Sequence, residues 1–191
     1  MQQAKEIFAL QGYDGLSMRT LAQKSGITLS VAYHYFKNKD ALLDELFGVT
    51  SRELGERRAQ LPRSDSAADM LRERIQFQID HMTDIVFILK YYMHFRHHYP
   101  QHAHGYLPLE ATKHIEEVLE YGRSTDEFTA CQDVTREAKV IAHSINGFLL
   151  EHYPAQPSAS EKEAMISSIH DFMMQALQQH HIAKPMAKTL S

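Results

Sequence analysis

The spacing of apolar residues constrains this chain more than any other feature of its sequence. Apolar side chains recur at intervals close to the 3.6-residue period of a helix, and no long stretch alternates apolar and polar residues as a half-buried strand does. Only 8 glycines and 6 prolines interrupt the 191 residues. The pattern predicts an all-α protein of about nine helices.

The stretch from Ser17 to Phe47 is the most informative. It reads as a short helix capped by Ser17, a turn at Gly26, a second short helix capped by Thr28, and a longer helix that begins near Asn38. Two short helices joined by a tight turn are typical of a helix-turn-helix, whose second helix enters the DNA major groove. Spacing alone leaves open a plain three-helix corner. We expect three residues of the second short helix to point inward, namely Ala32, Tyr35 and Phe36.

A first helix precedes this unit and stops at Gly12, with apolar positions at Ala4, Ile7, Phe8 and Leu10. A seam around Pro62 divides the chain. We therefore predict an N-terminal DNA-binding domain at residues 1–47, with its fourth helix continuing to about residue 60 as a connector. Residues 61–191 are expected to form a second domain, a helical bundle, whose role is considered below.

Charge is unevenly distributed. The whole chain has a net charge of −4, yet residues 1–39 carry five Lys or Arg residues against two carboxylates. A small basic region on an acidic body suits a localised phosphate-contacting surface. No stretch reaches the roughly 18 apolar residues of a membrane span, and the chain shows no signal-peptide pattern, so we expect a cytoplasmic protein without membrane contact. The single cysteine, Cys131, excludes an internal disulfide.

The N-terminal quarter resembles the TetR/AcrR family of one-component transcriptional regulators. The resemblance rests on two strings, Leu16-Ser17-Met18-Arg19-Thr20-Leu21-Ala22 with Ser25-Gly26-Ile27-Thr28, and Tyr33-His34-Tyr35-Phe36-Lys37-Asn38-Lys39-Asp40-Ala41-Leu42. It implies a DNA-binding regulator, most often a repressor, that binds a near-palindromic operator as a homodimer and is released by a small-molecule effector. It implies no enzymatic activity, cofactor or metal.

The resemblance also implies roles for individual residues. Thr28, Leu29, Ser30 and Tyr33 would reach bases from the start of the reading helix. Ser17, His34 and Lys39 would contact phosphates, and Ser17 would do so at a helix N-terminus, which is a ready anion site. Ser30 stands where the family commonly has glycine, and the chain has no basic lead-in before its first helix. We therefore expect individual sequence specificity and strongly salt-dependent affinity.

The last two long helices, near 134–153 and 160–181, would form a hairpin that pairs with a second copy as a four-helix bundle. Their wide apolar faces support this interpretation, although the same faces would also suit the core of a single chain. The expected interface residues are Ile141, Ile145, Phe148, Ile169, Phe172 and Met173.

The middle helices would enclose the effector pocket. Pockets are mostly apolar with a few placed polar groups. The expected lining residues are His81, Tyr91, Tyr92, His94, Phe95, Tyr106, His143 and Phe148.

Five histidines lie close together, at His94, His97, His98, His102 and His104. His94 and His98 are one helical turn apart, a spacing that suits a metal or a haem, so a metal- or haem-sensing regulator is an alternative. A surface cluster at a helix end is the simpler interpretation. A His-rich metalloenzyme is a further alternative, but the chain lacks a Gly-rich phosphate loop, an HExxH pair and a nucleophile elbow. The third alternative is a helical protein-interaction module that does not bind DNA.

Overall fold

The computed structural model describes residues 1–95, 108–155 and 157–178, and within these ranges every regular element is a helix. The helices are α1 (Gln2–Gly15), α2 (Met18–Lys24), α3 (Leu29–Tyr35), α4 (Lys39–Ala59), α5 (Ala67–Asp80), α6 (Met82–Phe95), α7 (Pro108–Ser124), α8 (Val134–His152) and α9 (Ala159–Gln178). The prediction of an all-α chain with about nine helices is confirmed. No helix of the described residues is long and apolar enough to span a membrane.

Polar side chains cap the helices where the sequence predicts. Ser17, Thr28 and Asn38 accept hydrogen bonds from backbone N–H groups in the first turns of α2, α3 and α4. Ser66 does the same for α5. Each side chain satisfies one of the backbone donors that a helix start leaves without a partner. The caps therefore fix where these helices begin.

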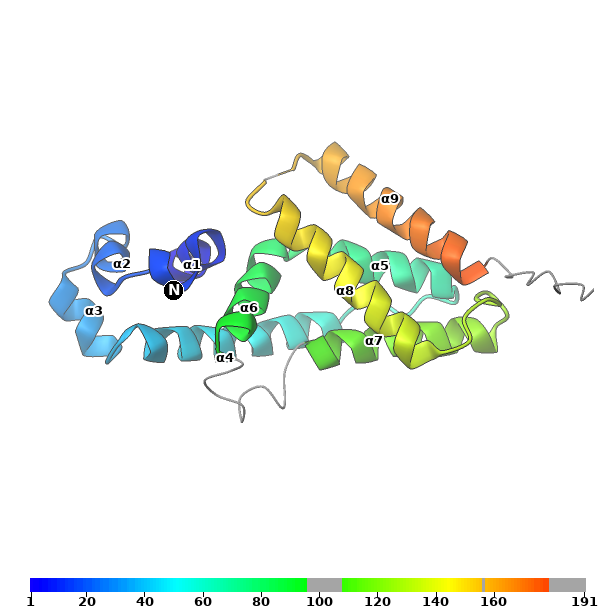
Figure 1. Cartoon of the computed structure of the whole chain (residues 1–191), viewed down its shortest axis with the longest axis horizontal. Coiled ribbons are helices and arrows are strands. Elements are labelled where there is room, and N and C mark those ends of the chain that lie inside the picture. The colour runs from blue at the N-terminus through cyan, green and yellow to red at the C-terminus, as the bar shows by residue number, and fades with distance from the viewer. Residues whose placement is uncertain (96–107, 156, 179–191) are drawn as a thin grey trace, which may run out of the picture.

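Figure 1 shows the arrangement of the chain. The helices α1 to α3 gather at one end, and α4 runs from them toward the middle of the molecule, passing beneath α6. We call α1 to α3 the head and α5 to α9 the body. The helix α4 is the continuous element between head and body.

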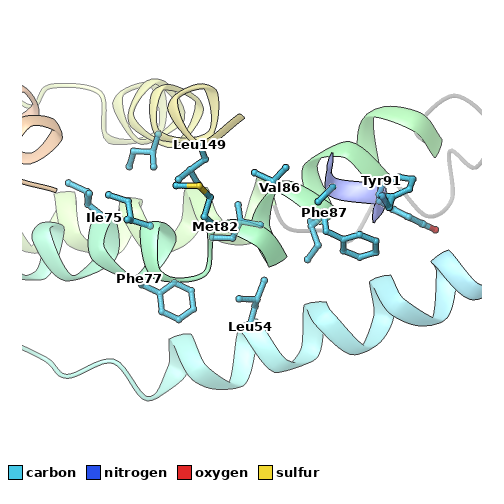
Figure 2. Close-up of a cluster of buried hydrophobic side chains, with 14 of the residues drawn as sticks. Leu54, Ile75, Phe77, Met82, Val86, Phe87, Tyr91 and Leu149 are labelled. Carbon is cyan, nitrogen blue, oxygen red and sulfur yellow. The ribbon is translucent and has the colours of Figure 1, made fainter. Parts of the chain in front are cut away.

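The core is assembled from α4, α5, α6 and α8. Leu54 of α4 faces Met82 and Val86 of α6, while Ile75 of α5 and Leu149 of α8 close the cluster (Figure 2). All of these side chains are buried. Burial of such apolar surface is the main stabilising contribution in a chain of this kind.

The C-terminal helices differ from the expected hairpin. In the structure α8 packs mainly against α7, whereas α9 packs mainly against α5. Polar contacts hold α9 on α5, including the pair Lys162–Asp80 at 3.1 Å and a bond between His170 Nε2 and the Ala68 carbonyl oxygen at 3.1 Å. The two helices are consecutive in the chain, but their closest partners lie elsewhere.

Cys131 is a buried side chain in the loop before α8. Burial raises the pKa of its thiol to about 12, so the group stays protonated at neutral pH. This agrees with an ordinary packing role.

Candidate DNA-binding surface

The turn between α2 and α3 depends on one glycine. Gly26 has a φ of +65°, a conformation that side chains of L-residues rarely adopt. Its N–H bonds the Gln23 carbonyl oxygen, and the next N–H, of Ile27, bonds the Ala22 carbonyl oxygen. These bonds terminate α2 and direct the chain into Thr28, the cap of α3.

The helix α3 turns most of its side chains to solvent. Ala32 is its one buried residue, and Leu29 is partly buried against the core. Thr28, Ser30, Tyr33 and His34 are exposed. Leu29 therefore does not lie with the other expected base contacts: its side chain belongs to the inner face, because it shares that face with Ala32 three residues later.

The prediction that Tyr35 points inward is wrong. Its side chain is 72% exposed, more than that of Tyr33 at 52%. The inner face consists of Leu29, Ala32 and Phe36, and Tyr35 lies about 100° around the helix from Phe36. Sequence reasoning thus missed an exposed aromatic residue on α3. The spacing of three and four residues from Leu29 to Phe36 was the signal that would have found it.

Lys39 is tied to the protein interior. Its ammonium donates to the Tyr13 carbonyl oxygen at 2.8 Å and lies 3.5 Å from the centroid of the Tyr13 ring. The Tyr13 hydroxyl in turn donates to Asp40 Oδ1 at 2.6 Å. Lys39 therefore joins α1 to the start of α4, and the neighbouring Lys37 is the exposed cation.

Ser17 is exposed, but its hydroxyl is already used. It accepts from the Thr20 N–H at 3.0 Å and lies 2.8 Å from the Thr20 hydroxyl. A phosphate at this helix start would accordingly meet the remaining backbone N–H groups of the first turn rather than the serine hydroxyl.

The aromatic residues expected to line a pocket instead pack against one another and against the head. Tyr91 stacks on Phe47 with centroids 4.1 Å apart, and Phe95 lies 4.5 Å from Tyr91. His94 stacks on Tyr13 at 4.0 Å. These side chains fill the junction between α6, α4 and α1, so they are packing residues there rather than walls of a cavity.

The other residues of the expected pocket are scattered. His143 is exposed, with Nδ1 2.6 Å from the Lys139 carbonyl oxygen, and Phe148 stacks on His152 at 3.9 Å. Tyr92 is half-buried on α6. Tyr106 lies outside the described residues. His81 alone among the described set lines a cleft, discussed below.

Three of the expected interface residues are buried within the chain itself. Ile141, Ile145 and Met173 are each no more than 5% exposed, so they pack in the core and offer almost no surface to a partner. Phe172 is 67% exposed, and Phe148 and Ile169 are half-buried. Val140, which was not among the predicted residues, is 59% exposed on α8.

The helix α6 is bonded along its length to α1 of the head and to α4. Near its start, Asp84 accepts from Lys5 of α1 at 2.7 Å. Farther along, Lys90 donates to the Ala9 carbonyl oxygen and the Tyr91 hydroxyl donates to Asp44 of α4. Head and body are therefore joined by specific polar contacts as well as by packing.

A cleft of about 940 Å³ lies where α1 meets the turn between α5 and α6 and the loop between α8 and α9. Its lining includes Lys5, Arg57, His81, Asp84 and Tyr153. Burial, followed by the charge of Arg57, lowers the pKa of His81, so this imidazole is neutral at pH 7. The cleft lies between head and body rather than inside the body.

Metal binding finds no support in the described residues. No group of three or more His, Cys, Asp or Glu side chains there is placed to hold a metal ion. Of the histidine cluster only His94 is described, and it stacks on Tyr13. His97, His98, His102 and His104 lie outside the described ranges.

Comparison with known proteins agrees with this geometry. Residues 1–46 match the family described as "Bacterial regulatory proteins, tetR family". No curated protein matches the chain significantly.

Several solved structures share the fold over nearly the whole chain. A TetR-family regulator from Rhodococcus RHA1 is 17% identical, with a TM-score of 0.69 over 94% of this chain and 95% of its own. The TetR-family regulator PfmR from Thermus thermophilus is 19% identical, with a TM-score of 0.71 over 93% and 98%. The ketosteroid regulator KstR2 of Mycobacterium tuberculosis is 16% identical, with a TM-score of 0.61 over 94% and 93%.

The matched segment contains the helix-turn-helix, and the fold of the remaining helices is that of the same regulators. Proteins of this family regulate transcription by binding DNA and are not enzymes. The resemblance drawn from the N-terminal sequence is confirmed: residues 1–46 match the tetR family of bacterial regulatory proteins, and the described helices have the fold of solved TetR-family regulators.

Proposed function

We propose that the protein is a repressor that binds a near-palindromic operator as a homodimer and leaves it when a small-molecule effector binds. The observation that carries this proposal is the outward face of α3. Thr28, Ser30, Tyr33 and Tyr35 are all exposed on a short helix with a single buried residue. A helix that buries so little of its own surface is suited to contact a partner surface, and the major groove admits a helix.

Each exposed side chain has a role that follows from its chemistry. The hydroxyls of Thr28 and Ser30 would hydrogen-bond base edges, and Tyr33 would pack against a thymine methyl or the sugar-phosphate wall. Tyr35 and His34 at the end of α3, together with Lys37, would contact phosphates. The N-terminus of α2 at Ser17 would bind a further phosphate through backbone N–H groups.

We propose that a second copy covers the exposed apolar side chains of α8 and α9. Val140 and Phe172 are the most exposed large apolar residues on these helices, and Phe148 and Ile169 are half-buried beside them. One reading helix covers few base pairs, so two heads spaced by one turn of DNA, roughly 34–36 Å or a multiple of it, are needed for specific binding. Dimerisation and operator binding are thus coupled.

The DNA-binding test measures fluorescence anisotropy with promoter DNA from beside the protein's own gene. We expect Tyr33→Ala and Tyr35→Ala each to weaken binding by about 5- to 100-fold, because each base or phosphate contact is worth about 1–3 kcal/mol. Lys37→Gln should reduce the slope of log affinity against log salt by about 1. Unchanged circular dichroism and Tm would show that the variants remain folded. Absence of a complex at both about 50 and about 200 mM salt, with a dimeric protein, would refute the proposal.

The interface test uses sedimentation analysis. Phe172→Glu should convert the dimer to a monomer, since it places a charge in an apolar contact, and should weaken operator binding in parallel. Gln175→Glu is the matched control, because it adds the same charge at an exposed polar position of α9. A Phe172→Glu protein that stays dimeric would show that the interface lies elsewhere.

A further inference from the structure

Arg74 of α5 has buried polar atoms that lack hydrogen-bond partners, which lowers the stability of the fold. Its Nε and Nη1 atoms are buried and have no hydrogen-bond partner within the described part of the chain. Burial is the main cause that lowers the pKa of its guanidinium, while Glu73 and Glu117 act to raise it. Among the described residues, the ion pair of Glu117 is with His114, and Glu73 Oε2 is buried without a hydrogen-bond partner.

A guanidinium whose buried nitrogens lack acceptors is unusual. Buried charges in proteins are paired or hydrogen-bonded, because each unsatisfied polar group lowers stability and a charged group lowers it more. A cost of this kind is retained where the group has another use. The missing partner of an arginine fork is an oxyanion, since carboxylates and phosphates match its donors.

Two further basic side chains surround this position. Arg58, near the end of α4, is only 5% exposed, and its guanidinium carbon lies 5.4 Å from the centroid of the Phe77 ring. His114 lies on α7, which packs against α5, and the charges of both arginines act on it. Burial, then the charge of Arg58, lowers its pKa, with a further lowering by Arg74. Arg58, Arg74 and His114 thus form a basic cluster contributed by α4, α5 and α7.

One edge of the cluster, at His114, is exposed to solvent. The His114 side chain is 32% exposed, with Nδ1 3.5 Å from Glu117 Oε2, and the Glu117 side chain is 67% exposed. An apolar side chain borders the cluster, since Phe77 is buried and its ring lies under the Arg58 guanidinium. An anionic group that approaches beside His114 would therefore meet basic donors next to an apolar side chain.

In the larger cleft between head and body, the lysine side chains are already paired with carboxylates. Its buried lysine, Lys5, is paired with Asp84 at 2.7 Å, and Lys162 at its rim is paired with Asp80 at 3.1 Å. These charges thus satisfy one another, whereas the buried donors of Arg74 are unsatisfied. The comparison favours the smaller, basic cluster.

We propose that the Arg58, Arg74 and His114 cluster binds the carboxylate or phosphate group of the effector, an inference that rests on the proposed function of an effector-released repressor. The anion accepts hydrogen bonds from Arg74 and His114 while its organic part packs on Phe77. Because Arg58 belongs to α4, which continues to the head, binding here favours one placement of α4 over another.

The test uses the full chain and three probes: octanoate, its neutral methyl ester, and inorganic phosphate. Binding is followed by calorimetry and by the shift in Tm, without DNA. Octanoate or phosphate should raise Tm, and the methyl ester should not. A response to octanoate alone identifies a carboxylate-bearing organic ligand, and a response to phosphate alone identifies a phosphorylated one. If neither anion binds, or if the ester binds as well as octanoate, the proposal is wrong.

Arg74→Gln separates a ligand site from a structural arginine. Removal of an unsatisfied buried charge should raise the Tm of the free protein by roughly 2–4 °C while weakening anion binding at least about tenfold. Arg74→Lys should retain part of the binding, since it keeps the charge. Arg136→Gln, which removes an exposed arginine, is the matched control and should behave as the unmodified chain. A lower Tm with unchanged anion binding would overturn the proposal.

Operator binding is measured separately by anisotropy, so the two proposals fail in different ways. A protein that binds the operator but no anion refutes the anion site and leaves the regulator intact. A protein that binds the anion but no operator refutes the repressor while the site stands.

Discussion

The two helices α3 and α6 use their residues in opposite ways. In α3, one residue of seven is buried, whereas in α6 seven of fourteen are buried. The side chains of α6 also hold α1 and α4 through Asp84, Lys90 and Tyr91. The comparison teaches that the helix proposed to contact bases has few buried side chains with which to stabilise the fold, whereas the helix that stabilises the fold has half of its side chains buried.

The largest expected effect is on α6. Phe87 is fully buried, with its ring centroid 5.4 Å from that of Phe8, so Phe87→Ala should lower the free energy of unfolding by about 3–5 kcal/mol through the cavity it leaves. On α3, Tyr35→Ala should change it by less than about 0.5 kcal/mol, because that side chain is mostly exposed. Urea denaturation measures both. Similar losses for the two variants would break the comparison.

A smaller effect is expected where α6 meets α1. Lys5 and Asp84 form an ion pair at 2.7 Å with side chains only 10% and 15% exposed. Asp84→Asn should lower the free energy of unfolding by about 1.5–3 kcal/mol, since it removes a charge-assisted hydrogen bond and leaves the charge of Lys5 without this carboxylate in a mostly buried position. A double-mutant cycle with Lys5→Met isolates the pair. A coupling energy near zero would mean that α6 holds α1 by packing alone.

The smallest effect concerns the loop between α7 and α8, which caps α5. Partial burial acts to raise the pKa of Glu127, but hydrogen bonds from the Ala67 and Ala68 N–H groups and from two hydroxyls outweigh it, so the pKa lies below 4.5. The stability from this carboxylate is present above the unfolded pKa and is lost as pH falls through the folded value.

Glu127→Gln should therefore lower the free energy of unfolding by about 1 kcal/mol at pH 7. The difference in this free energy between the variant and the unmodified chain should shrink as the pH falls below 4.5. Denaturation at several pH values gives the comparison. Glu116→Gln on α7 serves as a control for the loss of one carboxylate. A difference that stays constant with pH would show that the carboxylate charge does not stabilise the cap.

Local features of the fold could be predicted from the sequence because their causes are local. Ser17, Thr28, Asn38 and Ser66 cap helices since a short polar side chain can reach an N–H two or three residues ahead, whatever the rest of the chain does. The motif from Ser17 to Phe47 was informative for the same reason. Its residues specify the turn at Gly26 and the exposed face of α3.

What each apolar face contacts could not be predicted, because that depends on distant elements. Ile141, Ile145 and Met173 lie on wide apolar faces that suit either a dimer or a core, and only the packing of α7 and α5 against them shows that they are core. Lys39 reads as a surface cation until Tyr13 folds over it. The aromatic residues of α6 likewise read as pocket walls until Phe47 fills the space.

Gly12 divides α1 into two helical pieces, with a φ of 71° and a ψ of −167°. No heavy atom lies within 4 Å of the position that a Cβ of residue 12 would take, so there is space for a side chain. The obstacle is the positive φ, which residues of L configuration rarely adopt. The mirror image of these angles is ordinary extended backbone. A chemically ligated D-alanine at position 12 would therefore fit where L-alanine is strained. Position 12 of α1, directly before Tyr13, therefore restricts the chirality of its residue and not the size of the side chain.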